Sequence, residues 1–278
     1  LSISFSVLPK VEPFIPTFDS TSEYRELAFR CKATMPSKYH RYVFDITWYI
    51  NNHKIVTKNK LPYNNLTTDG VLFRKDWKDD PNGPNVLGFW VMCKIRARQN
   101  SVSVPTPYNS SDAFYAGAKL QETTFTVKSG SEVTINIKST VPVACANVQG
   151  RTLCEIQIEL FSLKDQFQSR PANCNESLSD EEIKMSKSTC RLVFDGTKWE
   201  TYHSFKLQTL SDQALRSSYK CSAKLIAKSS IDSLWQNYQL PEVYIHVFKE
   251  VRPNSYCYSY NDPHIRTFDG RDVSRGLQ

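Results

Sequence analysis

Three short stretches decide the fold: ELAFRCKA (26–33), FDITWYI (44–50) and GFWVMCKI (88–95). In each of them apolar and polar residues alternate, so every second side chain lies on the same face. This period of two is typical of a β-strand with one buried face. Clusters rich in Asn, Asp, Pro and Gly, such as 60–70 and 78–85, lie between the strands and predict turns.

The order of Cys31, Trp48 and Cys93 on these strands resembles the immunoglobulin (Ig) superfamily. The resemblance implies two facing sheets, a Cys31–Cys93 bond between them and Trp48 packed over that bond. Val91 stands where such domains usually have a corner tyrosine, so the expected variant is atypical. The alternative is a β-sandwich of another kind with two unpaired core cysteines.

A second β unit is expected after the Pro- and Ser-rich stretch 103–114. Its alternating segments are 124–137, 154–160, 218–225 and 241–248. The dipeptide Asp195–Gly196 predicts a hairpin turn, and Tyr219 precedes Cys221 at the spacing of a tyrosine corner. The stretch 177–190 is the one helix candidate, with Ser179 as its N-cap.

Cysteine usage and glycosylation sequons indicate an oxidising, secretory setting. No cysteine pair has C-x-x-C spacing and none has a zinc-finger histidine nearby, so disulfides are favoured over zinc. The pairings Cys145–Cys154 and Cys174–Cys190 are suggested by proximity alone, and other connectivities stay open. The eight cysteines are Cys31, Cys93, Cys145, Cys154, Cys174, Cys190, Cys221 and Cys257, and the three N-x-S/T sequons begin at Asn65, Asn109 and Asn175.

The segment CYSYNDPHIRTFDG (257–270) has a Cys, an Asp-Pro-His and a Thr-Phe-Asp-Gly in close succession. It resembles the start of a von Willebrand factor type D domain, a module of secreted multidomain proteins such as mucins, adhesion proteins and matrix components. With β-sandwiches before it, the order is similar to the N-terminal part of the family of von Willebrand factor D and EGF domain-containing proteins. The segment is short for a type D domain, so we expect a truncated start.

Two properties of type D domains are affected by differences in this sequence. Some members cleave themselves between Asp and Pro of Gly-Asp-Pro-His, which corresponds to Asp262 and Pro263 here. Asn261 replaces the Gly, and Asn tolerates positive φ less readily, which argues against cleavage. Without a type D partner, Cys257 is expected to be free, to bridge chains or to bond within the second sandwich.

The fold class expected is therefore all-β, with two Ig-like or fibronectin-III-like sandwiches in tandem. The expected divisions are a sandwich over 1–107, a linker over 108–115, a second sandwich over 116–250 and the incomplete type D start over 251–278. No run of apolar residues is long enough to span a membrane, so no membrane insertion is expected.

Charge and motif content point to binding rather than catalysis. No nucleotide-binding, nucleophile-elbow or metalloprotease motif occurs, so no enzyme, cofactor, metal site or nucleic-acid partner is expected. The net charge is +7, and Lys94, Arg96 and Arg98 alternate with the buried face of one strand. We expect this basic stripe to project into solvent, either for solubility or to meet sulfated glycans or acidic partners.

These observations favour a secreted or cell-surface-associated, non-enzymatic module that binds an extracellular protein, a receptor or the matrix. The alternative is a structural matrix or mucus-like component whose chains assemble through intermolecular disulfides, with Cys257 as the bridging residue.

Overall fold

The structure is a computed structural model of the chain. It describes residues 8–16, 26–36, 41–144, 146–148, 151–153, 155–161, 183–185, 192–209, 218–248, 258–260, 264–266 and 272–274. Strands make up nearly all of the regular structure in these residues, as expected for an all-β protein. Single 3-10 turns occur at η2 (Tyr63–Asn65), η3 (Arg74–Asp76) and η5 (Gly196–Lys198). None of the described helices is long and apolar enough to cross a membrane.

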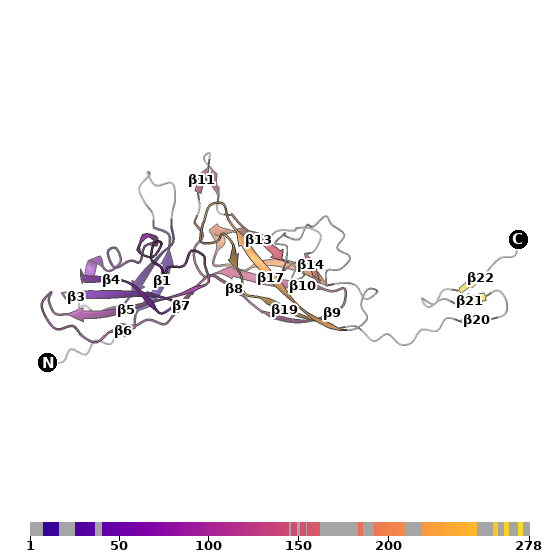
Figure 1. Cartoon of the computed structure of the whole chain (residues 1–278), viewed down its shortest axis with the longest axis horizontal. Helices are drawn as coiled ribbons and strands as arrows, with labels where there is room; N and C mark the ends of the chain where they lie inside the picture. Colours follow the sequence, from indigo (N-terminus) through magenta and orange to yellow (C-terminus); the bar gives the residue numbers. More distant parts are fainter. Residues whose placement is uncertain are drawn as a thin grey trace.

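The first sandwich packs a five-stranded sheet against a two-stranded one (Figure 1). Its strands are β1 (Lys10–Phe14), β2 (Ala28–Lys32), β3 (Val43–Ile50), β4 (His53–Pro62), β5 (Phe89–Arg98), β6 (Asn109–Ser110) and β7 (Phe114–Ala116). The larger sheet has the order β4-β3-β5-β6, and β7 also pairs with β5. The smaller sheet pairs β1 with β2. Burial alternates residue by residue along β5, as its sequence predicts.

A disulfide joins the two sheets at the centre of this sandwich. Cys31 on β2 bonds to Cys93 on β5, which confirms the pairing that the Ig resemblance implies. Trp48 on β3 is fully buried, lies opposite Cys93 in the register of β3 and β5, and donates its indole N–H to the Gly70 carbonyl at 2.9 Å. Constraining a loop of this size stabilises the fold by about 4 kcal/mol in the chain-entropy account.

The stretch 108–115, expected to be a linker, contains two strands of the first sheet. Asn109 pairs with Ile95 and Ser110 with Lys94, and Phe114 then pairs with Val91. These short strands complete the edge of the sheet beside β5. The first sandwich therefore extends to Ala116, and the passage to the second sandwich is a single residue, Gly117, before β8.

The second sandwich has two larger sheets. Its strands are β8 (Ala118–Leu120), β9 (Thr124–Lys128), β10 (Glu132–Ser139), β13 (Glu155–Phe161), β14 (Ile183–Met185), β15 (Leu192–Asp195), β16 (His203–Thr209), β17 (Tyr219–Lys228), β18 (Tyr238–Gln239) and β19 (Val243–Phe248). One sheet has the order β14-β16-β10-β8. The other has the order β15-β13-β17-β19-β9, with β18 paired to β17. The pairing of β9 with β19 is parallel, so the first strand of this sheet in the sequence lies beside the last.

Two local predictions in the second unit are wrong. Within the expected helix 177–190, residues Ile183–Met185 form β14 and pair with β16, because pairing in the sheet overrides a helix signal based on one cap and a few acidic residues. Asp195–Gly196 does not turn a hairpin. It leads from β15 through η5 to β16, which lies in the opposite sheet.

Three remaining pairings involve short strands. β11 (Ala146–Val148) pairs with β12 (Arg151–Leu153). β20 (Tyr258–Tyr260), β21 (His264–Arg266) and β22 (Asp272–Ser274) form a three-stranded antiparallel sheet within the stretch 251–278. The residues Cys257, Asp262 and Pro263 lie outside the described residues, so the predictions about them stay predictions.

Side chains from both sandwiches meet at the junction between them. The hydroxyl of Tyr238 hydrogen-bonds to that of Tyr115 at 3.0 Å and accepts the backbone N–H of Ala118 at 3.0 Å. The Leu87 N–H of the first sandwich donates to the Leu234 carbonyl of the second at 2.9 Å. Leu234 and Tyr238 are both buried. The contact between the sandwiches is thus hydrogen-bonded and includes buried side chains.

Two glycines allow this close approach. Gly88 has a φ of +100°, and a Cβ at this position would lie 3.2 Å from the Tyr238 ring. A Cβ at Gly117 would lie 2.6 Å from the Tyr238 hydroxyl. A Cβ at Gly117 would therefore require a neighbouring side chain to shift, and a larger residue at Gly88 would crowd the Tyr238 ring and adopt an unfavourable φ.

We expect Tyr238→Phe to destabilise the protein by about 1–2 kcal/mol, because it leaves the buried Ala118 N–H without an acceptor. Chemical unfolding of the intact chain measures the change. Tyr202→Phe is the matched control, since Tyr202 is largely exposed and its hydroxyl has no described hydrogen bond. Equal stability of the two variants would contradict a structural role for the Tyr238 hydroxyl.

Candidate functional site

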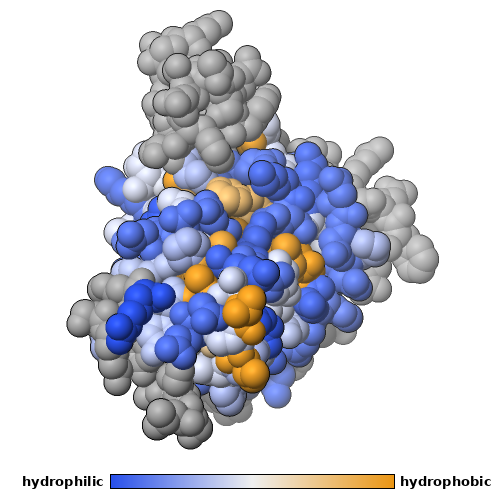
Figure 2. Space-filling view, turned by 90° about the vertical axis from the view of Figure 1, so that its left-hand side faces the viewer, coloured by the Kyte–Doolittle hydropathy of each residue, from blue (hydrophilic) through white to orange (hydrophobic). Residues whose placement is uncertain are grey.

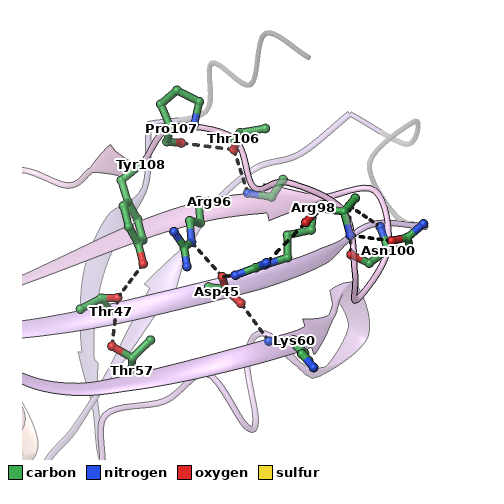
Figure 3. A network of polar contacts seen from close by, with 12 residues as sticks. Asp45, Thr47, Thr57, Lys60, Arg96, Arg98, Asn100, Thr106, Pro107 and Tyr108 are labelled. Carbon is green, nitrogen blue, oxygen red and sulfur yellow. Dashed lines mark hydrogen bonds and ion pairs between the residues drawn. The ribbon is translucent and has the colours of Figure 1, made fainter. Parts of the chain in front are cut away.

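A buried carboxylate, Asp45, organises the outer face of the first sheet. Its side chain has no solvent exposure although it lies on the face of β3 that turns away from the disulfide. Arg96 donates to it through Nε at 2.8 Å, and Arg98 through Nε and Nη2 at 3.0 and 2.8 Å (Figure 3). The backbone N–H of Lys60 donates to its other oxygen at 3.0 Å. Four hydrogen bonds and two cations therefore compensate the buried charge.

These contacts decide the ionisation of Asp45. Burial by itself raises the pKa of a carboxyl group. Here the hydrogen bonds from the Lys60 amide and from Arg98 and Arg96 outweigh burial, and they hold the pKa of Asp45 below its ordinary value of 3.8. Asp45 is therefore ionised at neutral pH and attracts both guanidinium groups.

Aromatic rings lie beside the cations on the same face. The Lys94 ammonium lies 4.7 Å from the centre of the Tyr49 ring, and the Arg96 guanidinium lies 4.6 Å from that of Tyr108. The Tyr108 hydroxyl hydrogen-bonds to the Thr47 hydroxyl at 3.3 Å (Figure 3). This bond connects the residue just before β6 to β3. Each cation is thereby held against a ring in a cation–π contact.

The β5–β6 loop, residues 99–107, is anchored to this network. The Asn100 carboxamide oxygen accepts the N–H groups of Val102 and Ser103 at 3.1 and 2.8 Å, which makes a tight Asx-type turn. Arg98 reaches the Ser103 carbonyl through Nη1 at 3.4 Å. At the other end of the loop, Thr106 exchanges two hydrogen bonds with Ala97. The loop is therefore held by hydrogen bonds at both ends.

This loop presents two apolar side chains to solvent. Val102 is 88% exposed and Val104 is 90% exposed. β5 begins beside the second sandwich, where Phe89 pairs with Ala116, and ends about 30 Å further along at the loop. The loop thus lies at the free end of the first sandwich. Figure 2 looks onto this end and shows hydrophobic side chains among a mostly hydrophilic surface.

The predicted basic stripe is on one face but does not simply project into solvent. Arg96 and Arg98 are about one-quarter and one-fifth exposed, because both turn to Asp45. Sequence reasoning missed Asp45, whose signal is an isolated acidic residue on the strand next to the stripe. It also missed Tyr49 and Tyr108. The alternation of β3 could have placed Tyr49 on the outer face, but nothing local places Tyr108 over Arg96.

Only some of the other predicted site residues lie within the described residues. Asn65 lies in η2 at the surface, where its side chain donates to Asp69 at 2.8 Å. Asn109 lies on β6. Asn175 and the cysteines at 145, 154, 174, 190 and 257 lie outside the described residues, and for Cys221 only the backbone of β17 is described. Their disulfides stay predictions.

No family model matches the chain. Among solved structures it is similar to the ectodomain of a teleost fish polymeric Ig receptor, at 10% identity and a TM-score of 0.29, over 89% of this chain and 100% of that one. It is also similar to extracellular domains 3–5 of Drosophila OTK, at 8% identity and a TM-score of 0.22, over 89% and 66% of the two chains. Cadherin-like domains 1–4 of zebrafish RET match at 10% identity and a TM-score of 0.22, over 77% and 42%.

Likenesses at these TM-scores carry no argument about function. The Ig-like assignment of the first sandwich depends instead on its own strand order, its inter-sheet disulfide and the buried Trp48. The second sandwich has the same two-layer design in its strand order.

We expect Asp45→Asn to destabilise the protein by about 3 kcal/mol, because it removes the charge that compensates two partly buried guanidinium groups. Chemical unfolding measures the loss. Asp112→Asn serves as the control, since Asp112 is exposed and has no described partner. A loss no larger than that of the control would mean that the Arg pair is held by other contacts.

The stability that Asp45 supplies should depend on pH. Because its folded-state pKa lies below the ordinary 3.8, the contribution is complete above that value and is lost as the pH falls through the folded-state pKa. The difference in unfolding free energy between the wild type and Asp45→Asn should therefore be constant at neutral pH and shrink below about pH 4. A difference that is independent of pH down to pH 2 would contradict this linkage.

Proposed function

We propose that the chain is a non-enzymatic protein-binding module of a secreted, multidomain adhesion, matrix or signalling protein, and that the β5–β6 loop is its main contact with a protein partner. The observation that carries this proposal is the pair Val102 and Val104, about nine-tenths exposed on a loop with a defined conformation. Apolar side chains held in one geometry bind with a smaller loss of conformational entropy than those on a loose loop.

The position of the loop supports the same function. It lies at the end of the first sandwich remote from the junction, where a partner can approach without meeting the second sandwich (Figure 1). Tyr238 and Tyr115 hold the two sandwiches together at the opposite end. A partner that docks at the loop would therefore bind a pre-organised surface on a sandwich that is anchored to its neighbour at the other end.

Two features support a secreted setting. A disulfide between sheets, Cys31–Cys93, is a device of proteins that fold in oxidising compartments. The segment 257–270 resembles the start of a von Willebrand factor type D domain, which suggests the family of von Willebrand factor D and EGF domain-containing proteins. The assembly alternative depends on Cys257, which lies outside the described residues, and a monomer on a non-reducing gel would count against it.

The proposal predicts that binding depends on the loop. The glycosylated chain, expressed with a secretion signal, is screened against an array of purified extracellular domains in parallel with the double variant Val102→Ser, Val104→Ser. We expect wild-type partners to bind the double variant at least tenfold more weakly, because two aliphatic anchors are lost.

Val193→Ser is the matched control, since Val193 is an exposed aliphatic residue on β15 of the second sandwich. It should leave the affinity for the same partners unchanged. Partners that bind the loop variant as tightly as the wild type would overturn the assignment of the contact, and an array without any partner would overturn the proposed function.

A further inference from the structure

Lysines on the central strands β17 and β5 have different partners. In the second sandwich, Lys224 and Lys228 on β17 pair with Glu242 and Glu159 at 3.6 and 2.6 Å. In the first, Lys94 on β5 has no described carboxylate partner and lies against the ring of Tyr49. The outer face of the first sheet thus has cationic charge that its own carboxylates do not neutralise.

Arg96 has unused donors on this face. Only its Nε is engaged by Asp45, and within the described part of the chain its two terminal nitrogens have no hydrogen-bond partner. Its guanidinium also lies over Tyr108, which is 39% exposed. Arg98, in contrast, uses Nε, Nη1 and Nη2 on Asp45 and Ser103. Lys94 and Arg96 are therefore the cations available to a ligand.

Exposed rings extend the same row along β5. Trp90 is 51% exposed, and its ring centre lies 5.1 Å from that of Tyr115. Because alternate residues of a strand are about 7 Å apart and share a face, Trp90, Met92, Lys94 and Arg96 form a row on one face of β5. Lys54 on β4 pairs with Tyr49 and adds a further exposed cation beside the row. The result is a linear surface that contains both exposed aromatic rings and cations.

We propose that this row, from Trp90 to Arg96, binds a linear sulfated polysaccharide. Sulfate groups would accept hydrogen bonds from Arg96 and the ammonium of Lys94, and sugar rings would pack on Trp90 and the tyrosines. The charge of the row is spread along a strand, which suits an extended polyanion. This site is separate from the β5–β6 loop and does not depend on a protein partner there.

The test is retention of the full chain on immobilised heparin, eluted with a salt gradient. Lys94→Glu should weaken binding about tenfold and lower the salt concentration of elution, because one attractive contact becomes repulsive. Lys220→Glu is the matched control. It makes the same change in net charge at an exposed position of β17 in the second sandwich, so it measures attraction due to net charge alone. Equal effects of the two substitutions, or no retention of the wild type, would overturn the proposal.

Competition in solution tests the chemistry of the ligand. Heparin and chondroitin sulfate chains should both displace the protein if sulfate is recognised, and their relative potency tells which backbone it prefers. Poly-glutamate of equal charge should compete at least tenfold less well, because it lacks sugar rings. Equal competition by poly-glutamate would assign the row to an acidic polypeptide and overturn the proposal.

Two further variants keep the result interpretable. Lys54→Glu changes the charge beside the row without altering β5, so it replaces Lys94→Glu if that variant unfolds, and the same loss of retention is expected. The double variant Val102→Ser, Val104→Ser should elute with the wild type. If it were lost from the column, heparin would be bound by the loop and the row would not be the site.

Discussion

The carboxylate of Asp45 is the group on which the outer face of the first sandwich depends. A charge without any solvent exposure is costly unless it is paired and hydrogen-bonded, and here two arginines and a backbone amide compensate it. Because Arg98 bonds to both Asp45 and Ser103, the same group that neutralises the carboxylate also positions the β5–β6 loop. The same Arg98 side chain therefore both compensates the charge of Asp45 and positions the loop.

The two candidate surfaces depend on this arrangement in different ways. The loop needs it for its shape, because Arg98 and Asn100 fix the turn that exposes Val102 and Val104. Along β5, Asp45 neutralises part of the positive charge: it engages Arg98 and the Nε of Arg96, and it leaves Lys94 and the terminal nitrogens of Arg96 available. A protein contact and a polyanion contact can therefore coexist on one small sandwich without overlapping.

Strands β2, β3 and β5 of the first sandwich follow from the sequence, because alternation of apolar residues is a local signal and Cys31, Trp48 and Cys93 lie at its inward positions. Contacts that connect distant residues do not follow. The Tyr238 hydroxyl accepts a hydrogen bond from the Ala118 N–H across 120 positions of the sequence, and no local sequence pattern near either residue predicts this contact. The edge strands β6 and β7 were missed because Pro and Ser are typical of linkers as well as of sheet edges. Asp195–Gly196 has hairpin chemistry, but the next strand packs in the other sheet.

The parallel pairing of β9 with β19 has a mechanical meaning. The chain enters this pair at Thr124 and leaves it at Phe248, and parallel alignment puts these two points at opposite ends of the ladder. Tension applied through the neighbouring segments would load the hydrogen bonds in shear, all together, rather than open them one by one. This geometry resists being pulled apart along the chain.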